Sequence, residues 1–397
     1  MLQNTHYELL RAKDEMGLFA SKKVEFKDVL KHEQFWNRYE RPPKEEFWDY
    51  ILDRRDLLVP QNLREYQGAF YTPPKWVMKS QEYLEKAFGE NYQEEYYIWD
   101  CAAGTGNLLV GLEDKYKLFA STLYKTDVDV MAQRIAKNNL KLLESHIFEF
   151  DFLNDPLPCM IHKEKQSGCF NCQNFDEKTT KIPQSLIKIL EDSKSREKLI
   201  IYINPPYAEP SSYKEKSKAK VANQTKVFEK YQDKVGKEAL SELFAQFFIR
   251  IHQEIPNCIL AQFSKLKIAQ SEKFIKFRNI FKARFLQGFI IPSYTFDNVD
   301  SDFPIVFVVW NLKSNTSFTT LHLDIFNENE QYLGVKTYRV LDNQEKLFRQ
   351  WRQSFYDKSS SITLGEVVIV GPTMQSNNNT FITTTAKESY RKKINGC

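Results

Sequence analysis

The chain has 397 residues, of which 42% are hydrophobic and 14% aromatic, enough for one large core with appendages or for two domains. Its net charge of +4 is small and does not by itself indicate a nucleic-acid partner. Because the sequence has neither an apolar run of membrane-spanning length nor the apolar core of a signal peptide, we expect a cytoplasmic protein. Its six cysteines are then expected as thiols rather than as a disulfide framework.

The first part of the chain, residues 1–65, is predicted to be a helical region that packs on the main domain. Phe47 and Ile51 stand at helical spacing, and two prolines interrupt the run before them. The triplet at 25–27 (EFK) fits half of a nuclease motif. Its surroundings have a helical pattern and no Pro-Asp strand precedes it, so no nuclease is expected here.

A strand followed by a glycine loop is predicted at residues 96–109 (YYIWDCAAGTGNLL). The strand ends at Asp100, and the loop from Gly104 to Asn107 opens a helix that begins near Leu108. Glycines let a backbone pass close under a ligand, and the first turn of a helix offers free N–H groups. The loop lacks the Gly-Lys-Ser/Thr of a phosphate loop and the GxGxxG of dinucleotide sites. The alternative is an ordinary strand–turn–helix without a ligand.

Two further strands are each predicted to end at a carboxylate. Residues 123–126 lead to Asp127, and residues 146–150 lead to Asp151 and Phe152. A carboxylate at the end of the second strand suits ribose hydroxyls. Asp151 suits the amino group of an adenine ring that Phe150 or Phe152 would contact. The alternatives are that Asp127 caps a helix and that Asp151 begins a turn.

A polar insertion at residues 155–198 contains four candidate metal ligands. They are Cys159 and His162, followed by Cys169 and Cys172, in the segment CMIHKEKQSGCFNC. Such Cys-x-x-His and Cys-x-x-Cys pairs occur in structural zinc sites, and a loop with little apolar content gains order from a metal. Four protein ligands would close the site, so the predicted role of the zinc is structural. Against a metal, the separation between the two pairs is short.

The apolar, β-branched run at residues 199–203 (LIIYI) is predicted to be a buried strand that ends in the turn Asn204-Pro205-Pro206-Tyr207. The prolines restrict the backbone, so the turn presents the Asn204 amide oxygen and nearby carbonyls as fixed acceptors. Hydrogen bonds from both N–H groups of an exocyclic amine to such acceptors favour the pyramidal nitrogen of a methyl-transfer transition state. The Tyr207 ring would stack on the attached base. The alternative is a surface turn without catalytic function.

The remainder of the main domain is predicted to complete a seven-stranded, doubly wound α/β sheet. A helix at 238–251 leads to a fifth strand at 258–263, and an antiparallel pair at 285–291 and 304–310 forms the edge of the sheet. Ligands bind at the carboxyl ends of strands in such sheets. The carboxylates and the asparagine described above fall at these positions.

Two lysine-rich stretches follow the asparagine turn, at 213–237 and 263–284, and are candidates for phosphate contacts. Solvated lysine faces are the alternative. Further on, strands at 318–326 and 331–340 are predicted to form a hairpin, and residues 365–382 resemble the entry to a target-recognition domain.

A lid segment at 68–74 (GAFYTPP), the glycine loop and the NPPY turn occur in this order, and together they resemble the γ group of N6-adenine DNA methyltransferases. More narrowly, the chain resembles the methylase portion of a bacterial type IIG, Eco57I-like restriction–modification enzyme. The resemblance implies a class I methyltransferase (Rossmann-like) domain at 66–312, after the N-terminal region 1–65. A short extension at 313–397 would be a partial target-recognition region. The implied activity is transfer of a methyl group from S-adenosyl-L-methionine to N6 of a flipped adenine in double-stranded DNA.

The resemblance also implies roles for individual residues. The catalytic set is Asn204, Pro205, Pro206 and Tyr207. In the lid, Phe70 would contact the cofactor and Thr72 would bond its carboxylate. The full cofactor-binding set is Phe70, Tyr71, Thr72, Asp100, Ala102, Gly104, Gly106, Asn107, Asp127, Asp151 and Phe152.

Relatives usually continue through a sizeable recognition domain, whereas this chain stops at Cys397. We therefore expect either a truncated chain or a separate recognition or restriction subunit as partner. Other functions also fit the asparagine turn. It serves methyltransferases that act on protein glutamine or on RNA bases, although these typically lack the lid segment. A catalytically silent DNA-binding remnant is a further alternative, as is a bifunctional restriction subunit whose nuclease lies outside this chain.

Overall fold

The computed structural model describes residues 72–162, 166–206, 223–296 and 303–340, and the backbone of two short antiparallel strands, β1 (Ala12–Lys13) and β2 (Phe19–Ala20). All of these belong to Met1–Asp342, and Asn343–Cys397 is a separate unit. Several predictions fall outside the described residues: the helical region at 1–65 apart from the two strands, Phe70, Tyr71, Tyr207, residues 213–222 of the first lysine-rich stretch, and the segment at 365–382.

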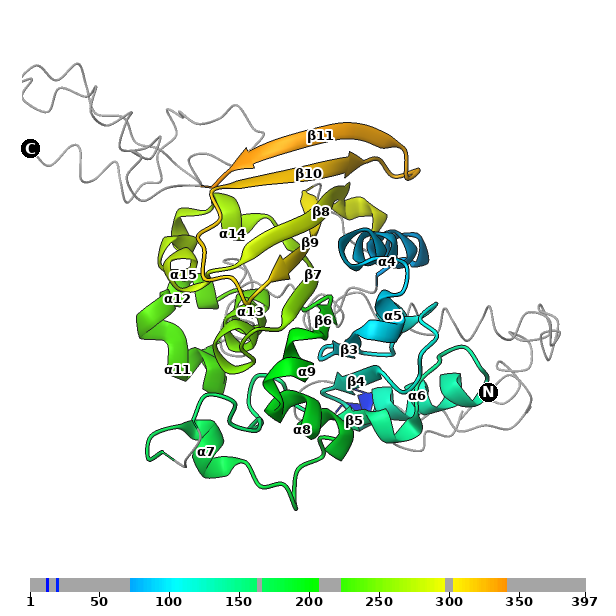
Figure 1. The fold of residues 1–397 in the computed structure, drawn as a ribbon, viewed down its shortest axis with the longest axis vertical. Helices are drawn as coiled ribbons and strands as arrows, with labels where there is room; N and C mark the ends of the chain where they lie inside the picture. Colours follow the sequence, from blue (N-terminus) through cyan, green and yellow to red (C-terminus); the bar gives the residue numbers. More distant parts are fainter. Residues whose placement is uncertain are drawn as a thin grey trace, which may run out of the picture. The chain divides into compact units, whose positions relative to one another are not determined.

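A single nine-stranded sheet organises the described residues, in the order β11-β10-β8-β9-β7-β6-β3-β4-β5 (Figure 1). Strands β5, β4, β3, β6 and β7 are parallel, and β9 runs antiparallel between β7 and β8. This order confirms the predicted doubly wound sheet of class I methyltransferase type. The strands are β3 (Tyr97–Asp100), β4 (Leu118–Thr122), β5 (Ile147–Glu149), β6 (Leu199–Ile203), β7 (Ile259–Lys265), β8 (Arg284–Pro292), β9 (Pro304–Asn311), β10 (Thr320–Phe326) and β11 (Tyr332–Arg339).

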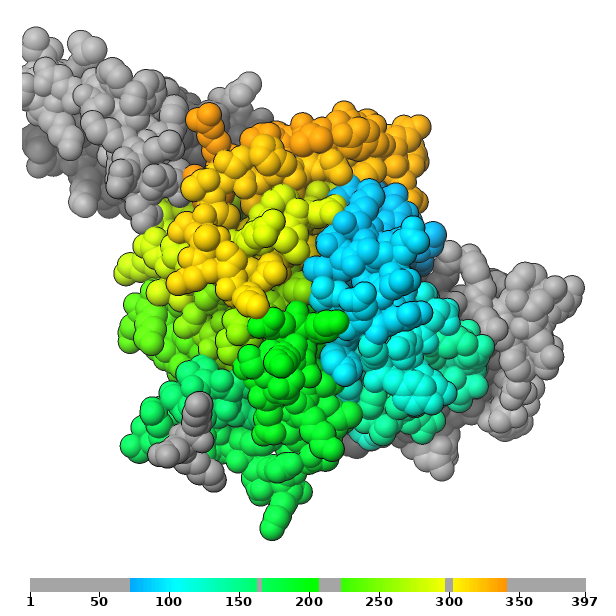
Figure 2. All heavy atoms as spheres, in the orientation of Figure 1, coloured from blue at the N-terminus to red at the C-terminus, as the bar shows by residue number. Residues whose placement is uncertain are grey.

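The sheet has two strands more than predicted, because the predicted hairpin joins it. Strands β10 and β11 pair antiparallel, and β10 pairs in parallel with β8. In the space-filling view this hairpin (orange) covers one end of the described region, next to helix α4 (Pro74–Phe88, blue) (Figure 2). The sequence indicated both strands but gave no sign of their partner in the sheet.

Helices cover both faces of the sheet and enclose two apolar cores. On β6, Ile200 and Tyr202 point to one core, and Leu199, Ile201 and Ile203 point to the other. The first core is closed by α4, α5 (Tyr92–Glu95) and α6 (Lys125–Ala136). The second is closed by α8 (Gln184–Glu191), α11 (Lys226–Val235), α12 (Lys237–Leu240), α13 (Leu243–Glu254), α14 (Lys267–Gln270) and α15 (Ile275–Ile280). Two short helices, α7 (Phe170–Asn174) and α9 (Ser193–Glu197), lie in the predicted insertion.

Some predicted boundaries were wrong for local physical reasons. The second strand is β4, which lies before the predicted strand at 123–126, because its five residues are all buried whereas Leu123 is 47% exposed. The helix expected near Leu108 is one 3-10 turn, η3 (Asn107–Leu109), and Gly111 follows it with φ +89°. The predicted helix at 238–251 is two helices, α12 and α13, because Glu242 between them has an extended backbone. Three other single 3-10 turns are η4 (Glu144–His146), η5 (Glu272–Phe274) and η6 (Ser293–Thr295).

Candidate active site and metal cluster

The carboxyl end of β3 carries a buried carboxylate and a glycine loop. Asp100 is 2% exposed, and its Oδ1 accepts a hydrogen bond of 3.0 Å from the N–H of Ala102. Burial raises the pKa of Asp100, the Ala102 N–H lowers it, and the resulting pKa is about 7. In the loop, Gly104 and Gly106 have φ of +52° and +84°. A Cβ at Gly106 would lie 2.9 Å from Leu140 Cδ1, so this position requires glycine.

An arginine that the sequence did not single out holds the glycine loop. Arg134 on α6 donates from Nη1 to the Thr105 carbonyl at 2.8 Å and to Asn107 Oδ1 at 2.7 Å. Asn107, predicted to bind the cofactor, therefore contributes its side-chain oxygen to fixing the loop. No local pattern marks Arg134, because the contact joins residues that are distant in the sequence.

The asparagine turn and the lid segment meet at the adjacent strand. Strand β6 pairs in parallel with β3, with Trp99 opposite Ile201, so Asn204 follows β6 at the same edge of the sheet as Asp100. Asn204 Nδ2 donates to Thr72 Oγ1 at 2.9 Å. Thr72 is buried, Pro205 is buried, and Asn204 and Pro206 are half-buried. The structure thus joins a residue predicted to be catalytic to one predicted to bind the cofactor.

Asp127 lies at the same edge of the sheet, although not at a strand end. It occupies the first turn of α6, and its Oδ2 accepts a hydrogen bond of 3.1 Å from Thr122 Oγ1, at the end of β4. Because β4 neighbours β3, the loop before α6 starts beside the end of β3. A carboxylate in the first helical turn also interacts favourably with the helix dipole, although the N-cap of α6 is Tyr124 and no side chain caps this helix.

Asp151 organises a turn after β5. Its Oδ1 accepts from the Leu153 N–H at 3.0 Å, its Oδ2 accepts from Asn154 Nδ2 at 2.8 Å, and its own N–H donates to Asp155 Oδ2 at 2.8 Å. Phe152 in this turn is 3% exposed and stacks on Phe247 with 5.2 Å between ring centroids. The Phe152 ring therefore packs in the core, where it also meets Trp99 of β3 edge-on with 5.7 Å between ring centroids.

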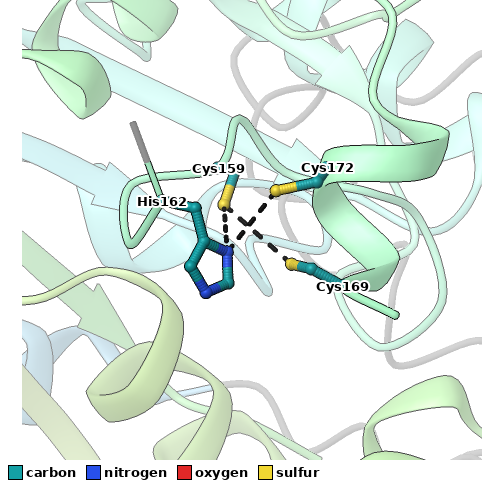
Figure 3. Close-up of side chains that lie close together, drawn as sticks. All are labelled: Cys159, His162, Cys169 and Cys172. Carbon is teal, nitrogen blue, oxygen red and sulfur yellow. Dashed lines mark hydrogen bonds between the residues drawn. The ribbon is translucent and has the colours of Figure 1, made fainter. Parts of the chain in front are cut away.

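The four predicted metal ligands lie together in the insertion. The ligand atoms of Cys159, His162, Cys169 and Cys172 are all within 4.8 Å of one another, and their side chains point toward a common centre (Figure 3). Burial raises the pKa of the Cys159 thiol, but hydrogen bonds from Cys172 and from the backbone at His162 and Ile161 bring it down to about 7. The composition and spacing of this cluster are those of a site that can bind zinc.

The second lysine-rich stretch contains fewer solvent-facing cations than its sequence suggested. Arg278 is 7% exposed and donates to the carbonyls of Ile268 and Ser271 at 2.9 and 3.0 Å. Lys267 pairs with Glu242 at 2.6 Å. The prediction of phosphate contact is wrong for Arg278, because its guanidinium satisfies buried backbone carbonyls instead.

Comparison with known proteins gives distant structural likenesses. No family model and no curated protein sequence matches the chain. The cryo-EM structure of the DrdV–DNA complex superposes with a TM-score of 0.47 at 13% identity, covering 84% of this chain and 37% of that one. The type IIG restriction endonuclease BpuSI gives 0.41 at 13% identity, covering 81% and 37%. A type I restriction–modification methyltransferase subunit from Streptococcus thermophilus gives 0.40 at 14% identity, covering 79% and 59%.

The chain therefore spans less than two thirds of each of these proteins and resembles modification subunits of restriction–modification systems only distantly. In the part of the chain that the structure describes, no helix has both the length and the apolar character needed to cross a membrane.

Proposed function

We propose that this chain is an adenine-specific DNA methyltransferase of a restriction–modification system, which methylates N6 of a flipped adenine. The observation that carries the proposal is the Asn204–Thr72 hydrogen bond at the carboxyl end of β6, beside the buried Asp100 at the end of β3. An amide acceptor and a candidate cofactor loop at neighbouring strand ends suit transfer between two bound molecules.

Asn204 would act as a fixed hydrogen-bond acceptor. Because its Nδ2 donates to Thr72, the plane of the amide is set and Oδ1 is the acceptor end. Oδ1 and the Pro205 carbonyl would accept the two N6 hydrogens, which favours a localised lone pair on a nitrogen that is otherwise a poor nucleophile. Tyr207 would stack on the base. The N6 proton becomes acidic as the N–C bond forms and then leaves to solvent, so no general base with a shifted pKa is needed at the outset.

S-adenosyl-L-methionine fits the end of β3 by its charge and by the backbone around it. The pKa of Asp100 is about 7 because burial disfavours its anion, and a cationic ligand group beside it would offset that cost. The positive φ angles of Gly104 and Gly106 provide a backbone that a ligand can approach closely. When bound, the cofactor would supply an electrophilic methyl group. Thr72, Asp127 and Asp151 remain its proposed further contacts, with Phe70, Tyr71, Ala102, Asn107 and Phe152 as predicted from the resemblance.

Double-stranded DNA is the proposed substrate, and its target base must leave the helix. N6 of a stacked adenine cannot reach a methyl group held in a protein pocket, so the nucleotide is rotated out of the duplex. Lysines in the two basic stretches would contact phosphates and make binding depend on salt concentration.

The test is transfer of tritiated methyl groups from S-adenosyl-L-methionine to mixed genomic DNA, followed by nucleoside analysis. We expect N6-methyladenine with the wild-type chain and none with Asn204→Ala. Asn174→Ala is the matched control, because Asn174 is exposed and its side chain donates to the Phe170 carbonyl of its own short helix. Tritium label on protein glutamine or on RNA, and none on DNA, would show that the substrate is not DNA. Cofactor binding without transfer to any of these would contradict the proposed activity.

A further inference from the structure

The strongest feature outside the proposed active site is the Cys3His cluster of the insertion. Three of its contacts have defined lengths: Cys159 Sγ to His162 Nδ1 is 3.4 Å, Cys172 Sγ to His162 Nδ1 is 3.5 Å, and Cys159 Sγ to Cys169 Sγ is 4.0 Å. A tetrahedral zinc with ordinary bond lengths holds a sulfur and a nitrogen about 3.6 Å apart and two sulfurs about 3.8 Å apart. The side chains are thus arranged as the ligands of one tetrahedral ion.

We infer that Cys159, His162, Cys169 and Cys172 bind one Zn²⁺, and that this metal holds the insertion against a buried ion pair that fixes the turn after β5. Four protein ligands complete a tetrahedron and leave no position for a substrate, so the site is structural. A disulfide does not explain the cluster, because all three cysteines are free and a disulfide would need its sulfurs about 2 Å apart.

The part of the insertion at residues 166–181 has little else to hold it. Between residues 166 and 181 only Asn171 and Cys172 are buried. A cavity of about 350 Å³ lies between the insertion and helices α11 and α13, with Gly168 and Phe170 on one side and Lys226 and Arg250 among the residues on the other. A segment this polar does not bury enough apolar surface to order itself, and a metal supplies the missing free energy.

Asn171 connects the cluster to the core. It precedes Cys172 on α7 and is 2% exposed. Its Oδ1 accepts a hydrogen bond from the Leu157 N–H at 3.2 Å, and its Nδ2 donates to Glu254 Oε2 at 2.9 Å. Because Cys172 would be a metal ligand, the ion fixes the backbone that aims Asn171 at Glu254.

The ion pair then reaches the turn after β5. Arg250 Nε donates to Glu254 Oε2 at 3.0 Å, and both residues are almost fully buried. The guanidinium also donates to the carbonyl of Phe152 and, at 2.6 Å, to that of Asp155. These carbonyls belong to the turn that Asp151 begins. Zinc, Asn171, Glu254 and Arg250 therefore form a continuous support for this turn, and its relevance to the cofactor rests on the proposed function.

The first experiment measures metal in the full chain, purified without chelators, by elemental analysis and by the absorption of a Co²⁺-substituted sample. We expect one zinc per chain and the charge-transfer and ligand-field bands of tetrahedral Co²⁺ bound to thiolates. Cys172→Ser and Cys169→Ser should lose the metal, whereas Cys258→Ala, which removes a buried thiol outside the cluster, should keep it. Wild-type chain that carries no zinc and gives no such Co²⁺ spectrum overturns the metal site, and that result does not depend on whether any variant folds.

The second experiment tests the connection without using the cofactor. Asn171→Ala should keep its zinc but exchange backbone amide hydrogens at residues 153–155 roughly tenfold faster than wild type, the change expected from losing one hydrogen bond to a charged group. Asn174→Ala, on the same helix, should match wild type. Unchanged exchange in Asn171→Ala overturns the support. If the proposed function also holds, Asn171→Ala weakens cofactor binding; a wild-type chain that binds zinc but no cofactor contradicts the function alone.

Discussion

Glu254→Gln tests the buried charge network most directly. The Glu254 carboxylate is 3% exposed and is surrounded by donors. Its Oε1 accepts from Lys230 Nζ at 2.7 Å and from Tyr231 Oη at 3.0 Å. Its Oε2 accepts from Arg250 Nε at 3.0 Å and from Asn171 Nδ2 at 2.9 Å. Glutamine has the same shape but replaces one oxygen with a donor, so two of these four donors would face an NH2 group.

The magnitude follows from the shifted pKa. Burial raises the pKa of Glu254, but the charges of Arg250 and Lys230 and the hydrogen bonds from Lys230 and Asn171 outweigh it, so the pKa falls from 4.5 to about 2. That difference corresponds to about 3 kcal/mol of stability from the ionised form. Independently of the pKa, removing one partner of a buried ion pair costs about 3–5 kcal/mol of stability, which agrees with the value from the pKa shift.

The assay is thermal unfolding of wild type and variant at several pH values. At pH 7 we expect the midpoint of Glu254→Gln to be lower by roughly 6–10 °C, at about 2 °C per kcal/mol. A lowered carboxyl pKa gives stability that is present above 4.5 and is lost as the pH falls toward about 2, so the difference should shrink across that window. Glu229→Gln is the control, because Glu229 pairs with Lys226 at the surface, with side chains 56% and 53% exposed. Its cost should stay below about 1 kcal/mol.

Two results would refute this reasoning. If Glu254→Gln melts within roughly 2 °C of wild type at pH 7, the four donors do not face an ionised carboxylate. If the difference persists unchanged from pH 5 down to about pH 3, the loss comes from packing and not from the charge.

Two further predictions concern the glycine loop and its carboxylate. Gly106→Ala should lower stability by about 2–4 kcal/mol, because it adds a contact of 2.9 Å with Leu140 to the strain of φ +84°. Gly111→Ala, at φ +89° but facing only the movable end of Gln81, should cost about 1–2 kcal/mol. Urea titration of both variants measures these costs, and equal losses of stability would contradict the steric account. Asp100→Asn should raise the melting temperature relative to wild type at pH 8 while weakening cofactor binding measured by calorimetry. Because the pKa of Asp100 is raised from 3.8 to about 7, its contribution to wild-type stability is full below pH 3.8 and is lost as the pH rises through 7. The melting temperatures of wild type and Asp100→Asn should therefore move apart over this range, and a constant difference would count against a buried Asp100.

The sequence was a good guide where a single local pattern determined the structure. The run at 199–203 is apolar and β-branched throughout, and it forms β6 with the predicted bounds. The Cys/His pairs lie within fourteen residues of one another, so few backbone paths could keep their side chains apart. The second strand was predicted too far along the chain, because Leu123 and Tyr124 extend the apolar pattern past Thr122, the residue at which β4 ends.

The contacts that the sequence did not reveal join residues far apart in the chain. Arg134 and Arg278 look like surface cations in a charged stretch, yet each donates to backbone carbonyls in the fold. Phe152 follows a candidate adenine ligand, but its side chain packs on Phe247 from α13. The helix packed over a strand end decides which of its side chains face a ligand and which face the core. That helix cannot be identified from the residues next to the strand in the sequence.

Strand β6 is also a segment of this protein that is open to misassembly during synthesis. Its five residues (LIIYI) carry no charge, and one of its two neighbours in the sheet, β7, is synthesised only after residues 204–258, with Ile201 opposite Leu260. An unpaired apolar strand of this kind readily stacks on copies of itself. The chain flanks it with Arg196, Glu197 and Lys198 on one side and with Pro205 and Pro206 on the other, and charges and prolines at these positions block intermolecular sheets. The turn proposed to receive the substrate base therefore also protects the nascent chain from aggregation.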